Sequence, residues 1–529
     1  MRALLLQASV ALLIGAAQAL TFAPWRLWWL APCCLLMLLR LAERQLSCNG
    51  WAGLRRFSLC GLCYGLGLAL CGSHWLYLAI YQGGHNPWVA VSLAAVLMLL
   101  FALHYAALFG LSAWLATASA AHAYERYCLL FFPACWVLSE WLRRATDYDF
   151  PWFVLGESQV PGGIFSGFAP VGGAFAASYL LLLGVGAVAV LLRRRRQPSR
   201  VLGTACLMLL ALLIAGDQLL RRQQWSEMDG APIHAVVLQS MQAGGDKWHA
   251  GTTRVAMRRV QTVVLRNEDS LIVTPETMLD APANLIPASF WDGLHDSLAQ
   301  RHSYLLLGVP TVEQAGEALH IYNSVLSLGP GGAELYRKQH LVPVAEHMPF
   351  KETLGGFYRA ALHYPLQDQS PGEAGWGKPL FAAGHMFAPL ICYDAAYGAQ
   401  AARETVEANV IVNLSDDSWI DSETYFAQTE QMAQARALET ARPLLRSNNM
   451  GHTAAIDAQG NIIAAAPARS EAELRVTLTG RAGTTPYMRL GDMPVLMLAA
   501  TAILAGLLPW RRMLRPSWRK RPLADMRAH

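Results

Sequence analysis

The feature that most restricts the fold of this chain is the uneven distribution of its hydrophobic residues. From Met1 to about Leu220, long apolar runs follow one another with only seven acidic residues between them. From about Arg221 to Leu490 the composition becomes ordinary, and one last apolar run follows. The 529-residue chain is 54% hydrophobic and 15% charged, which is too apolar for an ordinary soluble protein. The sequence therefore predicts a multi-span α-helical membrane domain, a soluble domain and a closing membrane helix.

Eight apolar runs are predicted to cross a membrane as helices. Several are shorter than the ~20 residues that a perpendicular helix needs, so the second and fifth could lie partly at the membrane interface. The first run also fits a signal peptide, but a retained helix is favoured because the second run begins within a few residues. The predicted spans are residues 4–20, 27–41, 57–80, 88–115, 127–142, 174–192, 201–220 and 492–510. The predicted domains are a membrane domain at 1–220, a soluble domain at 221–490, a C-terminal membrane helix at 491–512 and a basic cytoplasmic tail at 513–529.

Basic residues beside the apolar runs give the predicted orientation. They gather at residues 40–56, 193–200 and 511–521. The positive-inside rule assigns such segments to the cytoplasm, and the spans before the soluble domain then carry it to the opposite side. Because the basic residues accompany hydrophobic runs, the net charge of +5 indicates topology signals and argues against a nucleic-acid partner.

The connection between the fifth and sixth spans, residues 147–173, is rich in glycine and proline and lies on the outer side in this topology. It contains Phe150-Pro151-Trp152. Aromatic residues are common at headgroup level in membranes. The connection is therefore interpreted either as an interfacial loop or as a rim beneath the soluble domain that contacts lipid or substrate.

Short apolar runs alternate with helix-like segments in the soluble part. Many of the runs contain consecutive apolar residues, as in strands buried on both faces. This alternation predicts an α/β domain in which helices cover the sheets. The predicted strands are residues 233–239, 271–275, 304–309, 323–328, 386–392, 410–414 and 444–449. The predicted helices are 254–266, 288–300 and 424–441, and a hairpin is predicted from 453–456 and 462–465.

Three polar residues follow predicted strands, where side chains can converge. They are Glu276, Lys338 and Cys392, and Cys392 is the only one of the ten cysteines in the soluble part. A carboxylate that takes the thiol proton, a thiolate that attacks a carbonyl and an ammonium that stabilises the oxyanion are sufficient for acyl transfer. Each residue also has a purely structural interpretation: a helix cap for Glu276, a solvated charge for Lys338 and core filling for Cys392. Their joint placement favours chemistry.

With these residues, several short segments resemble the apolipoprotein N-acyltransferases, membrane-bound members of the nitrilase, or carbon-nitrogen hydrolase, superfamily. The resemblance covers nearly the whole chain, and the segments occur in the family's order. They are Phe150-Pro151-Trp152, residues 166–173, Val237-Leu238-Gln239 with Lys247-Trp248, Pro275-Glu276-Thr277, residues 338–350, Ile391-Cys392-Tyr393-Asp394, and residues 436–439 with 442–447.

The resemblance implies an α-β-β-α sandwich for the soluble domain and a ping-pong reaction on the periplasmic face of a bacterial inner membrane. Cys392 would take an acyl chain from a phospholipid as a thioester and pass it to the α-amino group of a diacylglyceryl-cysteine apolipoprotein. Glu276 would be the general base and Lys338 the stabilising cation. No cofactor or metal is implied, because a phospholipid ester is already an acyl donor. Supporting or substrate-binding roles are implied for Glu346, Tyr393, Asp394 and Trp248.

Some positions depart from the family pattern. The family usually has glutamate where this chain has Asp394, and histidine where it has Thr429. Two alternatives therefore remain: a divergent paralogue that acts as an amidase or acyltransferase on another membrane substrate, or a non-catalytic lipoprotein-binding relative. Residues 351–378 are interpreted as a mobile lid or as an ordinary surface loop. Further departures are Thr274 in place of tryptophan, Ala345 in place of glycine and Asp416 in place of asparagine.

Overall fold

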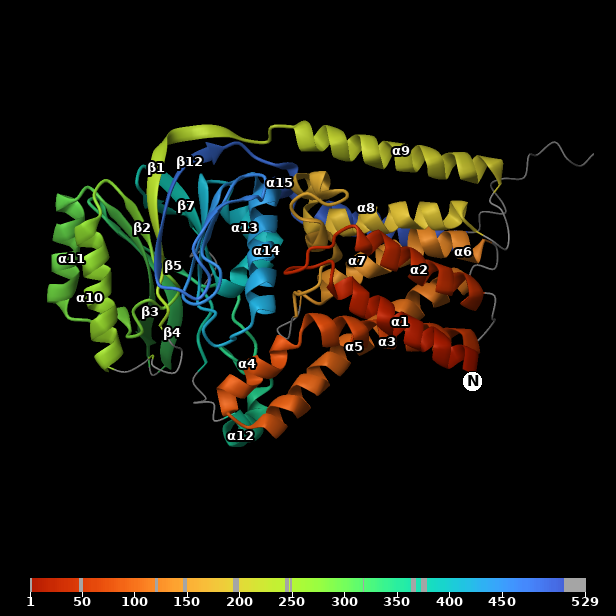
Figure 1. Ribbon diagram of the computed structural model, residues 1–529, viewed down its shortest axis with the longest axis horizontal. Coiled ribbons are helices and arrows are strands. Elements are labelled where there is room, and N and C mark those ends of the chain that lie inside the picture. Colours follow the sequence, from red (N-terminus) through yellow and green to blue (C-terminus); the bar gives the residue numbers. More distant parts are fainter. Residues whose placement is uncertain are drawn as a thin grey trace, which may run out of the picture.

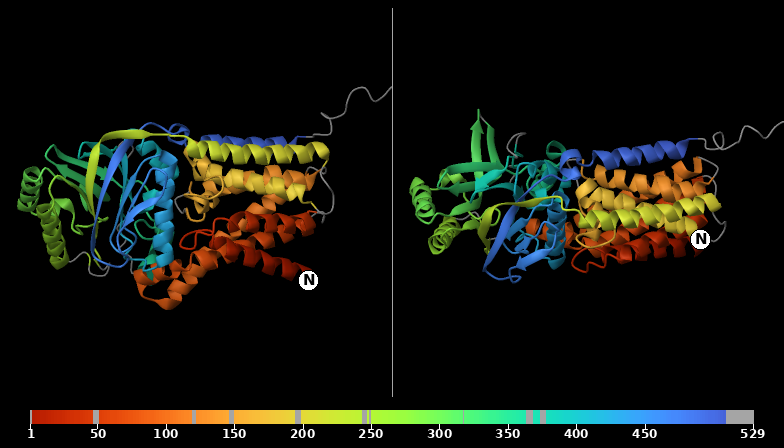
Figure 2. Two further views of the ribbon diagram at one scale, coloured as in Figure 1. Left: turned by 45° about the horizontal axis from the view of Figure 1, so that its top comes forward. Right: turned by 90° about the horizontal axis from the view of Figure 1, so that it is seen from above.

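The chain forms a bundle of helices with a two-sheet domain at one end of it (Figures 1 and 2). The change from helices to strands falls between Arg222 and Glu227, and helix α16 (Met493–Leu507) returns from the sheets to the bundle. The N-terminal end of the bundle lies far from the sheets (Figure 1). The computed structural model describes residues 2–46, 51–118, 122–145, 150–193, 199–242, 247, 250–316, 318–362, 368–372 and 378–508.

The apolar runs of the first part are helical in the structure. The third predicted span is two helices, because the helix that ends at Gly72 is followed by a new one that starts at Trp75. Four helical stretches in the described ranges are long and apolar enough to cross a membrane: Gly53–Gly72, Pro87–Ala118, Ser166–Leu191 and Arg200–Arg222. Shorter apolar helices are Leu4–Ala19 and Met493–Leu507. The elements are α1 (Arg2–Ala19), α2 (Leu30–Gln45), α3 (Trp51–Gly72), α4 (Trp75–Gly84), α5 (Pro87–Ala118), α6 (Ala123–Arg126), η1 (Tyr127–Phe131), α7 (Phe132–Leu142), η2 (Leu155–Gln159), η3 (Ser166–Phe168), α8 (Ala169–Leu191) and α9 (Arg200–Arg222).

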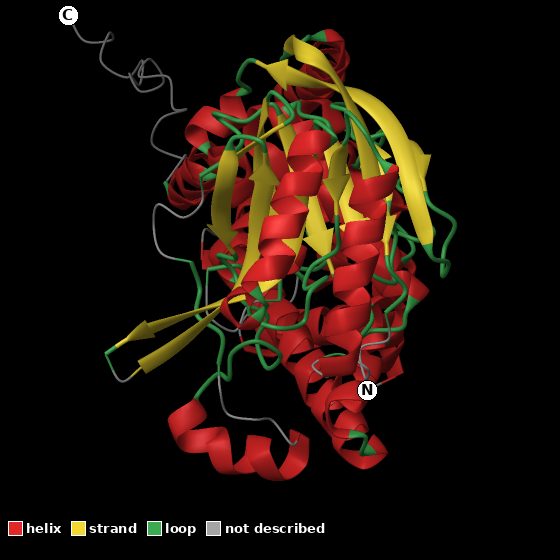
Figure 3. Cartoon of the chain, turned by 90° about the vertical axis from the view of Figure 1, so that its left-hand side faces the viewer, coloured by secondary structure: helices red, strands yellow, loops and turns green. Residues whose placement is uncertain are grey.

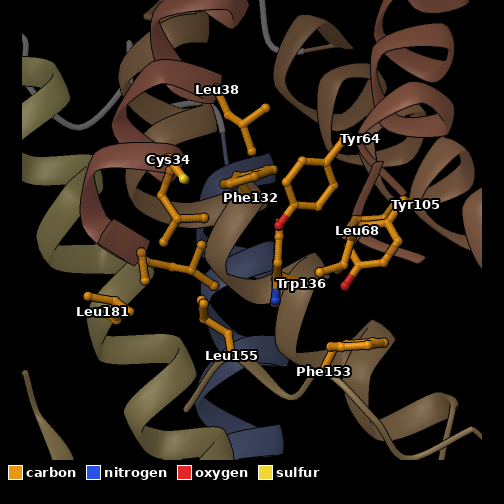
Figure 4. Close-up of a cluster of buried hydrophobic side chains, with 14 of the residues drawn as sticks. Cys34, Leu38, Tyr64, Leu68, Tyr105, Phe132, Trp136, Phe153, Leu155 and Leu181 are labelled. Carbon is orange, nitrogen blue, oxygen red and sulfur yellow. The ribbon is translucent and has the colours of Figure 1, made fainter. Parts of the chain in front are cut away.

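Close packing of α1 on α3 depends on glycine. A Cβ on Gly15 would lie 1.9 Å from the carbonyl oxygen of Tyr64, and one on Gly67 would lie 2.0 Å from that of Leu12. Small residues allow helices to approach this closely in lipid, where packing replaces the hydrophobic effect as the driving force. Aromatic rings fill the space beside this contact, and Tyr64 lies edge-on to Tyr105 at a centroid distance of 5.2 Å (Figure 4).

The soluble part is built from two six-stranded sheets, with the orders β12-β1-β2-β3-β4-β5 and β11-β10-β9-β8-β7-β6. Strands β1, β2 and β3 are parallel, and so are β7, β8 and β9. The strands of the first sheet are β1 (Glu227–Gln239), β2 (Leu271–Val273), β3 (Tyr304–Ala315), β4 (Ala318–Gly329), β5 (Gly332–Arg337) and β12 (Ala472–Ala482). Those of the second are β6 (Leu380–Ala382), β7 (His385–Ile391), β8 (Val410–Ser415), β9 (Leu444–Asn448), β10 (Ala454–Ile456) and β11 (Ile462–Ala465).

Helices cover the outer face of each sheet, so the layers run α-β-β-α (Figures 1 and 3). The inner faces of the sheets pack together through buried residues such as Val237, Leu306, Phe387 and Val412. The covering helices are α10 (Ala250–Arg266) and α11 (Ala288–Gln300) on the first sheet, and α13 (Gly398–Glu404) and α14 (Glu423–Thr440) on the second. This arrangement confirms the predicted sandwich.

Helix α14 lies between the second sheet and the helical bundle (Figure 1). Gln428 on α14 donates to the carbonyl oxygen of Gly72 at 2.9 Å and accepts from Trp75 Nε1 at 3.2 Å. Gln431, one turn further, accepts from the backbone N–H of Ala23 at 2.9 Å. All three partner residues belong to the bundle, so α14 is buried on its sheet face and on its bundle face.

Most of the connection at residues 150–173, called the outer loop below after its predicted side, is buried. This burial overturns the interpretation of Trp152 as an anchor at headgroup level. Trp152 and Phe153 are 5% and 3% exposed. The ring of Trp152 stacks on Tyr425 of α14 with centroids 5.9 Å apart. Residues 146–149 lie outside the described ranges. The described part of the loop forms the contact between the bundle and the two-sheet domain.

The segment interpreted as a lid or a surface loop begins with a helix, α12 (Lys351–Leu362). This helix lies against α4 of the bundle (Figure 1). Just before α12, Met348 is buried against Ile80 of α4 and Leu93 of α5. Residues 363–367 and 373–377 lie outside the described ranges, so the lid interpretation stays a hypothesis for them.

Candidate active site

The carboxyl ends of three parallel strands meet at one edge of the second sheet, and Cys392 lies there. Ile391 on β7 is paired with Leu414 on β8, which is paired with Ser447 on β9. Cys392 follows Ile391 directly, begins the short 3-10 helix η6 (Cys392–Ala396) and has a φ of +48°. Residues with side chains seldom adopt this left-handed conformation. A sharp turn from strand to helix presents the side chain of the turn residue in front of the sheet, as nucleophiles require.

A buried cluster of three charges comes from the loops after β2 and β5. Lys338 Nζ lies 2.8 Å from Glu346 Oε1 and 3.3 Å from Glu276 Oε1. The side chains of Lys338 and Glu276 are 1% and 7% exposed. An unpaired charge at such depth would be strongly destabilising, so the ammonium and the carboxylates depend on one another.

Hydrogen bonds fix the orientation of both carboxylates. Asn323 Nδ2 donates to Glu276 Oε1 at 2.6 Å and to Glu346 Oε1 at 3.3 Å. The backbone N–H of Asp416 donates to Glu276 Oε2 at 2.8 Å, and that of Val342 donates to Glu346 Oε2 at 2.8 Å. Every oxygen of the two carboxylates therefore has a partner, as buried polar groups require.

The electrostatics favour a neutral thiol that is activated only during reaction. Burial raises the pKa of Cys392 well above its usual value; the Glu276 carboxylate adds to the effect and the Lys338 ammonium opposes it. Burial also raises the pKa of Glu276, against the influence of Lys338. Although burial acts to lower it, Glu276 and Glu346 raise the pKa of Lys338 well above its usual value. The thiol thus lies in the field of a carboxylate with increased proton affinity and of a permanent cation, which are the groups that a general base and an electrostatic stabiliser require.

Asp394 is fully buried and holds the turn that carries Cys392. Its Oδ2 accepts from the backbone N–H of Ile391 at 3.1 Å, and its Oδ1 accepts from that of His340 at 2.9 Å. His340 lies two residues after Lys338. One carboxylate thus connects the Cys392 turn to the Lys338 segment, and the shorter aspartate side chain reaches both N–H groups.

Behind Asp394 lies a second layer of buried polar groups. The Tyr336 hydroxyl is 3.3 Å from both Asp394 Oδ2 and Glu404 Oε1. Gln400 Nε2 donates to the Tyr336 oxygen at 3.1 Å and to Glu404 Oε1 at 3.0 Å. Burial, followed by the charge of Asp394, raises the pKa of Glu404 well above its usual value. The Tyr336 hydroxyl can donate to either carboxyl group. The raised pKa of Glu404 favours its neutral form, and a hydrogen-bond chain can then run from Glu404 through Tyr336 to Asp394.

A narrow pocket with room for about one water molecule opens beside Cys392. Trp152 of the outer loop forms one wall, and Tyr425 and Met432 of α14 form another. The polar lining residues are Ser415, Asp417 and Thr429. The reactive turn is thus enclosed by both parts of the molecule, with a mixed apolar and polar wall.

The structure brings Glu276, Lys338 and Glu346 together and overturns the structural interpretations of the first two. Glu276 lies in the ion cluster and does not cap a helix, and Lys338 is among the largest fully buried side chains. The ring of Tyr393 packs on Trp152 at a centroid distance of 5.8 Å. Trp248 lies outside the described residues.

Sequence reasoning missed several groups that complete the site. Asn323 lies inside a predicted apolar strand, and an amide in that position is the one signal of its role. In the sequence, Lys247 is noted only within a segment that resembles the family. In the structure it is buried, forms an ion pair with Asp416 and donates to Thr277 Oγ1 at 2.9 Å. In the ranges that the structure describes, no group of three or more His, Cys, Asp or Glu residues is arranged to hold a metal ion.

Comparison with protein families assigns the two parts of the chain to known domain classes. Residues 222–487 match the carbon-nitrogen hydrolase family, and residues 14–188 match the apolipoprotein N-acyltransferase N-terminal domain. A carbon-nitrogen hydrolase from Helicobacter pylori G27 aligns with 54% of this chain and 99% of its own chain, at 16% identity and a TM-score of 0.33.

Two relatives then identify the family. The chain is 33% identical over 515 residues to the apolipoprotein N-acyltransferase of Chromobacterium violaceum, which covers 97% of this chain and 95% of the relative. It is 32% identical over 494 residues to that of Nitrosomonas europaea, which covers 93% of this chain and 95% of the relative. The chain belongs to the apolipoprotein N-acyltransferase family, as the resemblance predicted.

Proposed function

We propose that this protein transfers an acyl chain from a membrane phospholipid to the α-amino group of a diacylglyceryl-cysteine apolipoprotein, through a thioester on Cys392. The observation that carries the proposal is the buried Glu276–Lys338–Glu346 cluster, whose charges act on the Cys392 thiol. Family membership over nearly the full chain supports the same activity.

In the first half-reaction, Glu276 takes the thiol proton as the sulfur of Cys392 attacks the phospholipid ester carbonyl. The Lys338 ammonium stabilises the negative oxygen of the tetrahedral intermediate. Collapse breaks the ester C–O bond, and the lysophospholipid leaves with the proton that Glu276 held. The acyl chain remains on Cys392 as a thioester.

In the second half-reaction, the α-amino group of the acceptor attacks the thioester carbonyl. The C–S bond breaks, and the proton lost by the amine passes through Glu276 to the leaving sulfur. The products are an N-acylated lipoprotein and the regenerated Cys392 thiol. A thioester is a good intermediate here because an amine displaces a thiolate far more readily than an alkoxide.

The two-sheet domain is proposed to lie in the periplasm, with eight helical spans holding the protein in the inner membrane. The C-terminal end of α8 and the N-terminal end of α9 lie at the end of the bundle far from the sheets (Figures 1 and 2). The arginine-rich residues 193–200 join these two ends, and the positive-inside rule assigns them to the cytoplasm. Donor and acceptor lipids would then reach Cys392 from the outer leaflet.

The two alternatives have less support. A paralogue with another membrane substrate is not favoured, because relatives that match nearly the full chain are named apolipoprotein N-acyltransferases. A non-catalytic lipoprotein-binding relative would have no reason to keep Lys338 buried beside two carboxylates, an arrangement that is hard to stabilise.

The decisive experiment traps the thioester. The purified full-length protein is incubated with phospholipid and its intact mass is measured before and after treatment with hydroxylamine. We expect a mass increase of one acyl chain that hydroxylamine removes, and we expect Cys392→Ser to lack the hydroxylamine-sensitive adduct. Cys33→Ser, which changes an exposed cysteine in the bundle, is the matched control and should behave as the wild type.

Absence of an adduct on the wild type would overturn the proposal. Complementation tests the second half-reaction in cells. The gene should sustain a strain depleted of its own lipoprotein N-acyltransferase, and the Cys392→Ser variant should not.

A further inference from the structure

One carboxylate oxygen beside Cys392 has no hydrogen-bond partner within the described residues. Asp417 is 0% exposed. Its Oδ2 accepts from Asn448 Nδ2 at 2.6 Å and from Arg446 Nη2 at 3.1 Å. Its Oδ1 accepts from no group that the structure describes. A buried carboxylate oxygen without a donor is costly, so this oxygen is suited to a donor brought by a ligand.

Asp417 lies at the same sheet edge as the nucleophile. It follows β8, and β8 is paired in parallel with β7, which ends immediately before Cys392. Asp417 and Cys392 line the same pocket, together with Trp152 and Tyr425. The negative charge of Asp417 also contributes to the raised pKa of the Cys392 thiol. The two side chains are therefore close enough to act on one bound group.

Two polar groups near Asp417, Arg446 and Thr429, are engaged with other partners. Arg446 is 1% exposed, and besides Asp417 it donates to Thr429 Oγ1 at 3.0 Å. The Thr429 hydroxyl itself donates to the carbonyl oxygen of Phe426 at 3.0 Å. The pocket therefore offers an incoming ligand an acceptor at Asp417 and no free donor at Thr429.

Asp417 and the proposed base act from separate positions. Both oxygens of Glu276 are held, one by Lys338 and Asn323 and the other by the backbone N–H of Asp416. The chain then places the side chain of the next residue, Asp417, in the pocket. Two carboxylates thus reach the reacting centre, one beside a lysine and one with an open oxygen.

We propose that Asp417 recognises the α-amino group of the acceptor, with Oδ1 accepting one N–H while the nitrogen faces the thioester on Cys392. This inference rests on the proposed function and explains how one site serves two unlike substrates. The reacting ester group of a phospholipid has only acceptor oxygens, so it leaves Oδ1 unused. A primary amine has N–H groups for both carboxylates: one is held by Asp417 and another is lost to Glu276.

The test separates the two half-reactions in the full-length protein. Wild type and Asp417→Asn are loaded with phospholipid, and the thioester is then treated with a synthetic diacylglyceryl-cysteine peptide or with 2-mercaptoethanol, a neutral thiol. Asp417→Asn should lose about tenfold in transfer to the peptide, mainly through a higher KM. Its reaction with the thiol should stay within about twofold of the wild type. Asp421→Asn, the same change at an exposed position of the same loop, is the control and should match the wild type in both reactions.

Equal loss toward the peptide and the thiol would overturn the inference, because it would indicate a structural role, and so would a change confined to hydrolysis of the thioester. If wild type forms no thioester, the proposed function fails instead.

A second measurement does not depend on the variant folding. Wild type should transfer to a peptide with an N-methylated α-amine about tenfold more slowly than to the primary amine, since one N–H is missing. Equal rates for the two peptides would also overturn the inference.

Discussion

At the level of single residues, the proposed activation of the Cys392 thiol depends on the buried charges around it. Glu276 is held between Lys338 and Asn323 with its proton affinity increased by burial. The thiol is neutral at rest for the same physical reason. In the proposed mechanism Glu276 therefore acts as the base during attack, and the rate should follow its ionisation.

The pH dependence of thioester formation tests this mechanism. Because burial raises the pKa of Glu276, its base form is populated only at higher pH than for an ordinary glutamate near ~4.3. The wild-type rate should rise with pH through this raised value and then level off. Glu276→Gln should lower the rate about 100-fold or more and remove this rise. A wild-type rate that is already level at the ordinary pKa of glutamate would contradict the assignment.

Asp394→Asn tests whether this carboxylate positions the Cys392 turn. Asp394 accepts from two backbone N–H groups, of Ile391 and His340, through different oxygens. An amide nitrogen would place a donor against one of them, which costs about 1–3 kcal/mol. We expect a lower thermal unfolding temperature and slower thioester formation. Wild-type stability together with wild-type rate in this variant would show that the turn does not need the carboxylate.

The sequence predicts the site residues that follow strands better than those that reach the site only through the tertiary fold. Glu276, Lys338 and Cys392 follow strands, so their position in the sequence indicates convergence. Asn323 and Asp417 reach the surroundings of the thiol only because two sheets and an adjacent loop meet there. A single amide or aspartate in a sequence does not indicate which charge it will contact.

At the level of secondary-structure elements, the same difference applies to strands. The buried parallel strands β2, β7, β8 and β9 were predictable because each contains a run of consecutive apolar residues. Strand β12 alternates polar and apolar residues on a partly exposed edge, and β5 is short and exposed in its first half, so neither stands out in the sequence.

Gly173 has a structural role in residues 166–173, one of the segments that resemble the family. Gly173 interrupts α8 with a φ of +70°, and a Cβ there would lie 2.6 Å from the ring of Tyr487. The interruption frees the backbone N–H of Ala174, which donates to Glu439 Oε1 on α14 at 2.8 Å. A helix break in the bundle thereby becomes a contact with the two-sheet domain.

Helix α13 carries the acid of the second polar layer, and Glu404→Gln tests its protonation. Because burial raises the pKa of Glu404 and favours its neutral form, Glu404→Gln should leave the protein at least as stable as the wild type at neutral pH, whereas Glu404→Ala should cost about 2–3 kcal/mol, because Gln400 and Tyr336 each lose a buried acceptor. The raised pKa of Glu404 also determines how the stability of the protein changes with pH. The stability contributed by Glu404 is full below the pKa of an unfolded glutamate and is lost as pH rises through the folded pKa.

Thermal unfolding of the detergent-solubilised protein over a range of pH measures this effect. The wild type should lose stability relative to Glu404→Gln as the pH rises through the folded pKa of Glu404. A glutamine variant that is strongly destabilised at neutral pH would indicate that Glu404 is ionised there and would contradict the proposed hydrogen-bond chain through Tyr336.

At the level of the whole molecule, the bundle and the Cys392 turn are joined through one buried ion network. Arg436 on α14 donates to Glu157 Oε1 of the outer loop at 3.2 Å and to Glu439 Oε1 at 3.0 Å. It also donates to the carbonyl oxygen of Ala395 at 3.1 Å, three residues after Cys392. Glu157 is paired in addition with Arg144 of the bundle at 2.9 Å. A single side chain therefore contacts the loop, the helix and the turn.

Arg436→Met tests whether this network couples the membrane part to the chemistry. Methionine has a similar length but no charge, so Glu157 and Glu439 would lose their shared cation in a buried place. Breaking a buried ion pair on one side costs about 3–5 kcal/mol. We expect a clearly lower unfolding temperature and, because Ala395 loses its donor, slower thioester formation at temperatures where the variant is folded.

Arg475→Met is the matched control, since Arg475 lies on β12 with its side chain 60% exposed and pairs only at the surface with Glu473. It should change stability by about 0.5 kcal/mol or less, because exposed ion pairs contribute little. Arg436→Lys separates charge from geometry: lysine keeps the positive charge but cannot donate to three oxygens from one planar group. We expect it to recover part of the stability and little of the rate, since the turn at Ala395 depends on the direction of the donor. Full recovery of the rate by lysine would show that charge alone, and not the contact with the turn, connects the two parts of the molecule.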